Sequence, residues 1–348
     1  MEWIADYGVF LLKSVTVLVA FIIFIGFVAS LSQRQKSDQR DGHVKIQSLN
    51  DDHEDNLDEF LASVLEPEAY KQHKKDEKKA KKAQAKKAGK KDSPEEGARP
   101  RVFVMDFDGD IKASAVEGLR REISTLVANK LEGDSVILRL ESPGGMVHSY
   151  GLGASQLDRI KKAGIKLRVS VDAVAASGGY MMACVADEIV AAPFSVIGSI
   201  GVVAQVPNVH RLLKKNDVDV EVLTAGKYKR TLTVLGENTE EGRQKFIDDL
   251  ESTHALFKTF VQEHRPRLDI EAVATGEIWY GKEAIDKGLV DRIATSDDLI
   301  LEALKTSQVF RVSYEHKKTL AERLGFAAEQ GVLKAFEQLL AQQTKRWF

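Results

Sequence analysis

Between residues 101 and 171 the chain alternates between two patterns, short runs of β-branched and apolar residues and longer stretches with apolar residues at helical spacing. These patterns predict strands at 101–107, 135–142 and 165–171 and helices at 114–131 and 149–163. Strands that alternate with helices form βαβ units, and the parallel sheet that they build is covered on both faces. The sequence therefore predicts an α/β fold, a layered sheet with flanking helices.

The pattern becomes less regular after residue 171. It predicts a helix at 208–216, a strand at 218–224 and a long helix at 239–264. A last stretch at 320–340 carries apolar residues along one helical face. We expect this stretch to pack against the body of the protein or against a partner subunit.

One long apolar run lies near the N-terminus. Residues 9–31 contain a single charge, Lys13, and a helix of this length crosses a hydrocarbon core of about 30 Å. A cleavable signal peptide fits poorly, because Glu2 and Asp6 precede the run and no A-x-A site follows it. We expect residues 1–33 to form an uncleaved, single-pass transmembrane helix that anchors the chain in a lipid bilayer.

Charged residues dominate the segment 34–100. An acidic run at 51–59 is followed by a lysine-rich stretch at 71–91 that has no apolar face to bury. Such a segment is a solvated helix or a largely disordered linker. Since no aromatic residues are interleaved with the lysines, we expect no nucleic-acid partner, and anionic lipid headgroups are the favoured contact.

Two serines and a glycine turn could take part in chemistry. In ESPGGMV, at 141–147, adjacent glycines let bare N–H groups approach a ligand, although a plain strand-to-helix turn also explains them. Ser177 follows a strand-like run and precedes a helix that begins near Gly179, so its hydroxyl is either a nucleophile beside backbone N–H groups or an ordinary N-cap. Ser199 lies between two glycines in VIGSIGVV, where no long side chain crowds it.

A serine nucleophile needs a base. His148 is the best histidine because it follows the glycine turn, but no histidine lies in a recognisable triad motif. A lysine of TAGKYKR, at 224–230, could serve instead if an apolar site without a nearby carboxylate lowers its pKa, whereas the ordinary reading is a solvated turn. Lys227 and Lys229 would each lower the pKa of the other if they lie close together.

Metal chemistry is not expected. The sequence has no Cys/His cluster and no HExxH motif. The single cysteine, Cys184, lies among apolar residues and excludes an internal disulfide. We therefore expect neither a metal nor a cofactor.

Together these motifs resemble those of the signal peptide peptidase A family of serine proteases. The matching stretches are SPGG, AASGGYMMACVADEIVAAPFSVIGSIGV, GKYKR and TGEIWYGKEAIDKGLVDRI, and the resemblance covers about residues 101–300. The N-terminal anchor and charged linker are similar to those of the SohB-type, short-form members. The resemblance implies the crotonase-like α/β fold of Clp protease subunits, with a protease domain at 101–300 and a helical extension at 301–348.

The resemblance also implies roles for individual residues. Ser177 matches the nucleophile, and Lys229, the last residue of a Gly-x-x-Lys match, corresponds to the general base. Ser199 matches a serine that helps orient this lysine. The backbone N–H groups of the oxyanion hole correspond to Gly178 and to Gly145, with Gly144 as the alternative to Gly145.

For the whole molecule, the resemblance implies a membrane-anchored serine endopeptidase that acts on membrane-associated or unfolded peptides. Short-form members assemble as rings, commonly octamers, in which neighbouring protomers can share one site. The family carries its protease domain on the outer face of the bacterial inner membrane. The basic residues that follow the apolar run instead favour the cytoplasmic side, so the sequence leaves the side open.

Two other functions remain open at this stage. One is a non-catalytic, membrane-anchored scaffold of the same fold that binds peptide tails. The other is an acyl-thioester enzyme, since the crotonase fold uses the same pair of backbone donors. A serine followed by a downstream lysine argues against the thioester enzyme.

Overall fold

A computed structural model describes residues 42–88 and 99–316 of the 348-residue chain. The expected transmembrane run at 9–31 and the amphipathic stretch at 320–340 lie outside the described residues. Among the residues that are described, no helix combines the length and the apolar character that a membrane crossing requires. Residues Val44–Ser313 form one compact unit.

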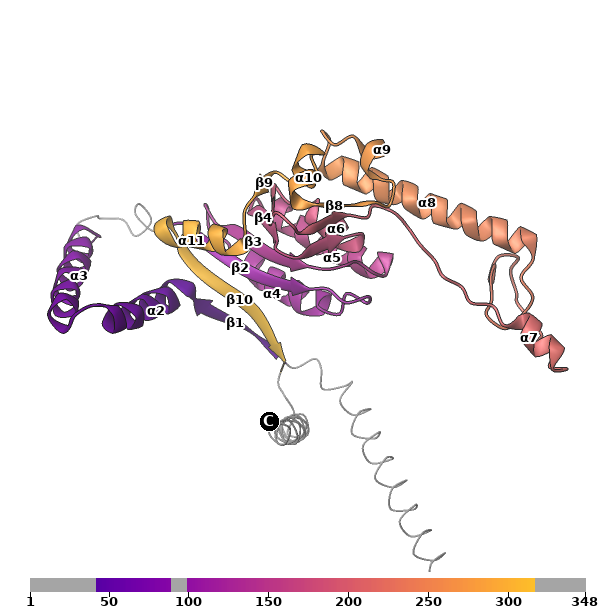
Figure 1. Ribbon diagram of the computed structural model, residues 1–348, viewed down its shortest axis with the longest axis horizontal. Coiled ribbons are helices and arrows are strands. Elements are labelled where there is room, and N and C mark those ends of the chain that lie inside the picture. The colour runs from indigo at the N-terminus through magenta and orange to yellow at the C-terminus, as the bar shows by residue number, and fades with distance from the viewer. Residues whose placement is uncertain (1–41, 89–98, 317–348) are drawn as a thin grey trace, which may run out of the picture. The chain divides into compact units, whose positions relative to one another are not determined.

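The main sheet has seven strands in the order β1-β10-β2-β3-β4-β6-β9 (Figure 1). Its strands are β1 (Gly42–Ser48), β2 (Arg101–Asp108), β3 (Ser135–Glu141), β4 (Lys166–Val171), β6 (Glu188–Ala191), β9 (Arg292–Ile293) and β10 (Gln308–His316). From β10 to β9 every neighbouring pair is parallel. The predicted α/β fold with a largely parallel sheet is therefore confirmed.

A second, three-stranded sheet lies beside the segment that contains Ser177. Its order is β5-β7-β8, with strands β5 (Val174–Ala176), β7 (Val196–Gly198) and β8 (Ile278–Tyr280). β5 and β7 are parallel, and β8 pairs antiparallel to β7. This small sheet ends next to both candidate serines.

Ten helices surround or extend from the sheets within the described residues. They are α2 (Leu49–Val64), α3 (Pro67–Ala88), α4 (Val116–Ala128), α5 (Val147–Lys162), α6 (Gly178–Ala183), α7 (His210–Lys215), α8 (Glu240–His264), α9 (Ile270–Val273), α10 (Gly281–Asp286) and α11 (Ser296–Thr306). The helices expected at 114–131, 149–163, 208–216 and 239–264 correspond to α4, α5, α7 and α8, with ends that differ by a few residues.

The two faces of the main sheet bury different apolar residues, because successive side chains of a strand point to opposite faces. Phe103, Met105 and Phe107 of β2 belong to the large core that includes the buried residues of α4 and α5. Val102 and Val104 pack in a smaller cluster with the apolar residues of α11. Only the large core is continuous with α6 and the candidate site.

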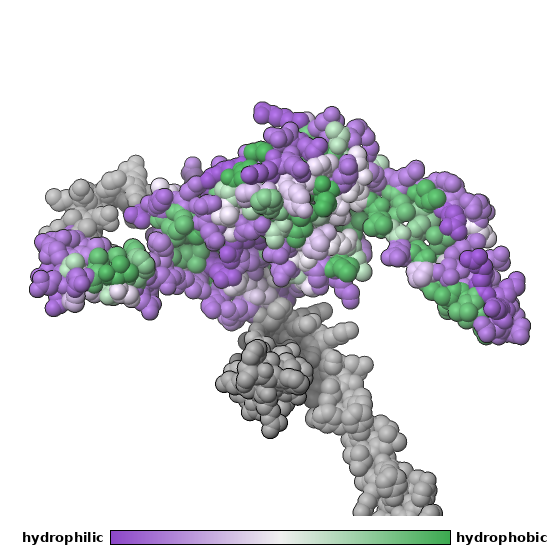
Figure 2. Space-filling view, in the orientation of Figure 1, coloured by the Kyte–Doolittle hydropathy of each residue, from purple (hydrophilic) through white to green (hydrophobic). Residues whose placement is uncertain are grey.

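One predicted strand does not form. Residues 218–224 have no regular structure, and Leu223 is 88% exposed. Alternating β-branched residues favour a strand, but a strand needs a partner to take up its hydrogen bonds. Figure 2 shows apolar side chains at the surface of the region around α7 and α8.

The described structure also extends the sheet beyond the expected protease domain. Strand β1 and helices α2 and α3 lie within the segment 34–100, which the sequence suggests is a linker. Strand β10, from the expected C-terminal extension at 301–348, pairs with β2. The division of the chain at residues 33, 100 and 300 stays a prediction.

Candidate active site

Ser177 occupies a strained turn between a strand and a helix. It follows β5 and precedes α6, and its backbone has φ 51° and ψ −118°, a conformation that residues with a side chain rarely adopt. Its N–H donates to the Gly198 carbonyl at 2.8 Å, and its own carbonyl accepts from the Met181 N–H at 3.0 Å. A sharp strand-to-helix turn presents the nucleophile in α/β-hydrolases, where a glycine lies two residues before and two residues after the serine.

The Ser177 hydroxyl is not used as a helix cap. No cap hydrogen bond joins it to α6. The N-cap explanation of this serine is therefore wrong, and the strain at its backbone needs another explanation. Strain of this kind gathers at functional sites.

The two residues that follow Ser177 are glycines at positions where a side chain would clash with neighbouring residues. A Cβ at Gly178 would meet the ring of Tyr150, and one at Gly179 would lie 2.5 Å from the Ser142 carbonyl oxygen. Any side chain at either position would displace the start of α6. The pair of glycines thus lets the serine turn approach the strand β3 and the helix α5.

The glycine turn after β3 lies directly against Ser177. Gly144 has φ +91°, and a Cβ there would lie 2.7 Å from the Ser177 Cβ and 2.8 Å from the Gly178 nitrogen. The Gly144 N–H already donates to the Ser142 hydroxyl at 3.1 Å. By contrast, the N–H groups of Gly145 and Gly178 donate no hydrogen bond to any described residue. This difference favours Gly145 over Gly144 as a partner of Gly178 in an oxyanion hole.

Two buried hydroxyls hold the glycine turn in place. Tyr150 Oη donates to the Asp110 carbonyl at 2.7 Å and lies 2.5 Å from Ser142 Oγ. The hydrogen bonds therefore run from the Gly144 N–H through the two hydroxyls to Asp110. Burial raises the pKa of Tyr150, which keeps this hydroxyl protonated.

Tyr150 was not predicted to contribute to the site. Its position on the buried face of α5 fits an ordinary core residue. The available signal was a tyrosine, rather than a phenylalanine, at a buried helix position, since a buried Tyr hydroxyl usually has a partner.

Ser199 lies at the same edge of the small sheet as Ser177. Ala176 of β5 is in register with Gly198 of β7, so the two serines each follow a paired position of adjacent parallel strands. Ser199 also has a positive φ, 50°, and its N–H donates to the Glu277 carbonyl at 2.6 Å. The structure thus brings both predicted serines and the predicted glycines together.

Lys229 is not brought to these serines by the interactions of a single chain. Its side chain is exposed, and its ammonium group has no hydrogen bond or ion pair with a described residue. The apolar surroundings expected for a neutral lysine are therefore not formed around Lys229 within one chain.

Lys227 does not act as the expected neighbouring cation. Its ammonium lies 2.7 Å from Glu241 Oε1, and this carboxylate raises the pKa of Lys227. The expected lowering of the pKa is therefore contradicted for Lys227, because its bond to Glu241 stabilises the charged form.

The other candidates form no site. His148 is exposed in the first turn of α5 and makes no hydrogen bond to a described residue. Cys184 is buried and free, as its apolar neighbours predict. Within residues 42–88 and 99–316, no group of three or more His, Cys, Asp or Glu side chains could hold a metal ion.

Comparisons with known proteins agree with the motifs. Residues 2–157 match the model of the peptidase family S49 N-terminal region, and residues 159–310 match that of peptidase family S49. A probable protease SohB of Haemophilus influenzae is 51% identical over 98% of both chains. A second probable protease SohB, from Buchnera aphidicola subsp. Acyrthosiphon pisum, is 57% identical over 65% of this chain and 67% of its own length.

Among solved structures, a mutant of the membrane-bound stomatin-specific protease 1510-N covers 59% of this chain and 84% of its own at 17% identity, with a TM-score of 0.40. The two family models together cover most of the sequence, and the full-length relative extends over nearly all of it. The chain belongs to peptidase family S49.

Proposed function

We propose that this protein is a serine endopeptidase whose nucleophile is Ser177 and whose general base is Lys229. One observation carries the proposal: a serine with a positive φ and a hydroxyl free of any cap bond lies against a glycine turn. Gly145 and Gly178 directly follow the two residues in contact, Gly144 and Ser177, and their N–H groups have no partner among the described residues.

The proposed reaction uses these groups in sequence. Neutral Lys229 removes the proton of the Ser177 hydroxyl, and the oxygen attacks the carbonyl carbon of a peptide bond. The N–H groups of Gly145 and Gly178 donate to the oxyanion that forms. The protonated lysine then gives its proton to the leaving amine, and water hydrolyses the acyl-enzyme by the same route. Ser199 orients the lysine.

We infer that Lys229 reaches Ser177 from a neighbouring protomer. Within one chain, Lys229 is exposed and lies in a segment whose apolar residues have no core to enter, with Val203 91% exposed and Leu223 88% exposed. Exposed apolar surface of this kind marks interaction sites. Burial at a subunit contact would exclude water from Lys229 and lower its pKa toward neutrality. A homo-oligomeric ring, which in short-form members is commonly an octamer, provides such contacts.

The remaining parts of the proposal concern the membrane. Residues 9–31 anchor the chain by a single pass in the bacterial inner membrane, and the peptidase unit has the crotonase-like fold of Clp protease subunits. Substrates are membrane-associated or unfolded peptides. A reporter fused after Phe348 distinguishes a periplasmic from a cytoplasmic peptidase unit.

Hydrolysis of an unfolded protein tests the nucleophile. Ser177→Ala should abolish cleavage, whereas Ser155→Ala, a matched change at an exposed serine of α5, should leave the rate unchanged. Cleavage retained by the Ser177→Ala protein would rule out this mechanism.

The exposed position of Lys229 also suits the alternative, a non-catalytic scaffold that binds peptides. Mixing the Ser177→Ala and Lys229→Gln proteins separates the two functions. If sites span subunits, mixed assemblies contain sites with both native residues and recover activity. A scaffold shows no hydrolysis either before or after mixing.

A further inference from the structure

A row of carboxylates crosses the sheet face opposite to α4 and α5. Asp108 of β2 is in register with Glu141 of β3, and two pairs earlier Asp106 is in register with Arg139. Arg139 is in turn in register with Ser170 of β4. Because side chains two residues apart share a face of a strand, Asp108 and Glu141 lie on the same face as Asp106, Arg139 and Ser170.

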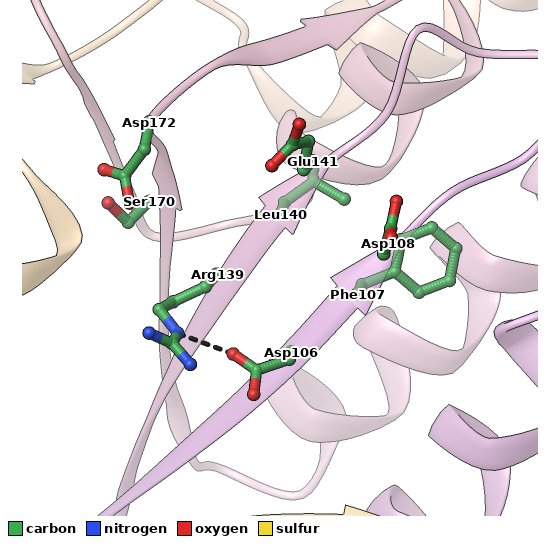
Figure 3. A pocket seen from close by; sticks show the side chains of 8 residues that line it. All are labelled: Asp106, Phe107, Asp108, Arg139, Leu140, Glu141, Ser170 and Asp172. Atoms are coloured by element: carbon green, nitrogen blue, oxygen red, sulfur yellow. Dashed lines mark hydrogen bonds and ion pairs between the residues drawn. The ribbon is translucent and has the colours of Figure 1, made fainter. Parts of the chain in front are cut away.

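These side chains line an open cavity of about 220 Å³ at the carboxyl ends of the three strands (Figure 3). Four carboxylates and one guanidinium contribute to the lining, together with a serine hydroxyl. The polar residues are Asp106, Asp108, Glu141, Asp172, Arg139 and Ser170. The cavity therefore carries a strong negative charge.

Two of the carboxylates already have partners. Asp106 accepts from Arg139 at 2.5 Å and from Arg311 at 2.6 Å. Asp172 accepts from the N–H of Ser296 at 2.8 Å and from its hydroxyl at 2.5 Å, at the start of α11. These contacts are internal to the fold and leave the other two carboxylates to be explained.

Asp108 and Glu141 have no such partners. Both side chains are exposed, and neither has an ion pair or hydrogen bond with a described residue. Like charges placed directly opposite each other on neighbouring strands destabilise a sheet, so an external cation at this point would relieve a repulsion.

Ser170 points independently to a ligand. It is 1% exposed, yet its hydroxyl has no hydrogen-bond partner among the described residues. A buried hydroxyl without a partner loses free energy relative to one in water, and such groups are rare in folded proteins. The hydroxyl belongs to the same cavity lining as the carboxylates, where it could accept from or donate to a bound group.

The chemistry of the lining decides which cation fits. The described residues offer no group of carboxylates arranged to hold a metal ion. One carboxylate of the lining, however, already accepts from two guanidinium groups, because Asp106 binds Arg139 of the lining and Arg311, which lies outside it. Carboxylates recognise guanidinium and ammonium groups through charge-assisted hydrogen bonds, so an arginine or lysine side chain suits this lining.

The position of the cavity relates it to the proposed reaction. Glu141 immediately precedes the turn that contains Gly144 and Gly145, and Asp172 precedes β5 and Ser177. We propose that this cavity binds a basic side chain, lysine or arginine, of a polypeptide held by the protein, and thereby selects substrates with a positive charge away from the cleaved bond. The substrate role rests on the proposed peptidase function.

Binding to the full-length Ser177→Ala protein tests the site without requiring turnover. The probes are an unstructured alanine–serine peptide that contains one arginine and the same peptide with neutral citrulline. At low salt the arginine peptide should bind about tenfold more tightly, as expected for two partly exposed ion pairs. Equal affinity for the two peptides would overturn the proposal, and this comparison needs no substitution in the cavity.

A matched pair of double variants locates the effect. Asp108→Asn with Glu141→Gln should reduce the affinity for the arginine peptide to that for the citrulline peptide. Glu132→Gln with Glu251→Gln makes the same change in net charge at exposed positions outside the cavity and should change the affinity less than about twofold. An equal loss in both double variants would show a nonspecific charge effect and reject the site.

The basic side chain has two possible sources, a separate substrate or the chain's own lysine-rich stretch at 71–91. Replacing the lysines of this stretch by glutamine distinguishes them. If the arginine peptide binds more tightly to the substituted protein than to the protein with its native lysines, the stretch occupies the cavity in competition with the peptide. If the affinity is unchanged, the basic side chain comes from a separate peptide. If the Ser177→Ala protein discriminates between the peptides but the native protein hydrolyses neither, the cavity stands and the proposed peptidase function fails.

Discussion

The contact between Gly144 and Ser177 leads to a prediction that distinguishes a loss of stability caused by backbone strain from a loss of activity caused by displacement of Ser177. Gly144→Ala places a methyl group 2.7 Å from the Ser177 Cβ, whereas ordinary contacts begin near 3.4 Å. Either the turn or the serine must therefore move by roughly 0.7 Å. Gly133→Ala is a matched control, because Gly133 has a similar φ, +86°, and nothing within 4 Å of its added Cβ.

The two variants should lose similar free energy of unfolding but differ in the position of Ser177. A residue with a Cβ in a left-handed conformation costs about 1–2 kcal/mol, so both variants should lose about this much free energy of unfolding. Only Gly144→Ala should also displace Ser177, the proposed nucleophile, from the N–H groups of Gly145 and Gly178. A misplacement on the order of 1 Å reduces reaction rates about 10²-fold.

The assay is the second-order rate of acylation by a fluorophosphonate, with urea unfolding measured on the same preparations. We expect Gly133→Ala to acylate at the native rate and Gly144→Ala to acylate about 10²-fold more slowly. Native acylation by a folded Gly144→Ala protein would refute the placement of the glycine turn against the nucleophile.

Three further predictions follow from other contacts. Lys229→Gln should lower peptide hydrolysis by about 10²–10⁴-fold, as expected for loss of a general base. Lys227→Gln removes an exposed ion pair with Glu241 and a cation–π contact with Tyr228, and should leave kcat within about threefold. Tyr150→Phe removes one hydrogen bond to the Asp110 carbonyl and one to the Ser142 hydroxyl, which keep the N–H groups of Ala113 and Gly144 as partners. Loss of two buried hydrogen bonds should lower the free energy of urea unfolding by about 1–3 kcal/mol. Burial alone would raise the pKa of Asp291, but the hydrogen bonds from Arg265 and from the Ile189 N–H, together with the charge of Arg265, outweigh burial and hold the pKa below its ordinary range. The stabilisation from this pair should thus be complete above about pH 4 and disappear as the pH falls through the lowered pKa, which the difference in unfolding free energy between native and Asp291→Asn proteins measures as a function of pH.

The sequence predicted the parts of the fold whose signal is local. The strands predicted at 101–107 and 135–142 form as β2 (Arg101–Asp108) and β3 (Ser135–Glu141), because their β-branched and apolar side chains are buried on both faces of a parallel sheet. The alternating residues at 218–224 carry a similar signal but form no strand within the described chain. Strand formation depends on a partner, which a local pattern does not supply.

The candidate site also has features that the local sequence predicts and features that depend on distant contacts. The glycines around Ser177 are readable in the sequence because close approach of two backbones excludes side chains. The positive φ of Ser177 could not be predicted, since the turn makes contacts with residues distant in the sequence: the Ser177 N–H donates to the Gly198 carbonyl, and Gly178 lies against the ring of Tyr150. The exposure of Lys229 could not be predicted either, because whether a side chain is buried depends on residues that are distant in the sequence.

Identifying the residue that acquires a covalent adduct tests the proposed mechanism most directly. The purified, assembled full-length protein is treated with a fluorophosphonate, digested, and analysed by tandem mass spectrometry. A single adduct on Ser177, absent from the Lys229→Gln protein, is the expected result. An adduct on Ser199 or another serine, or an assembled native protein that acquires none, would contradict it.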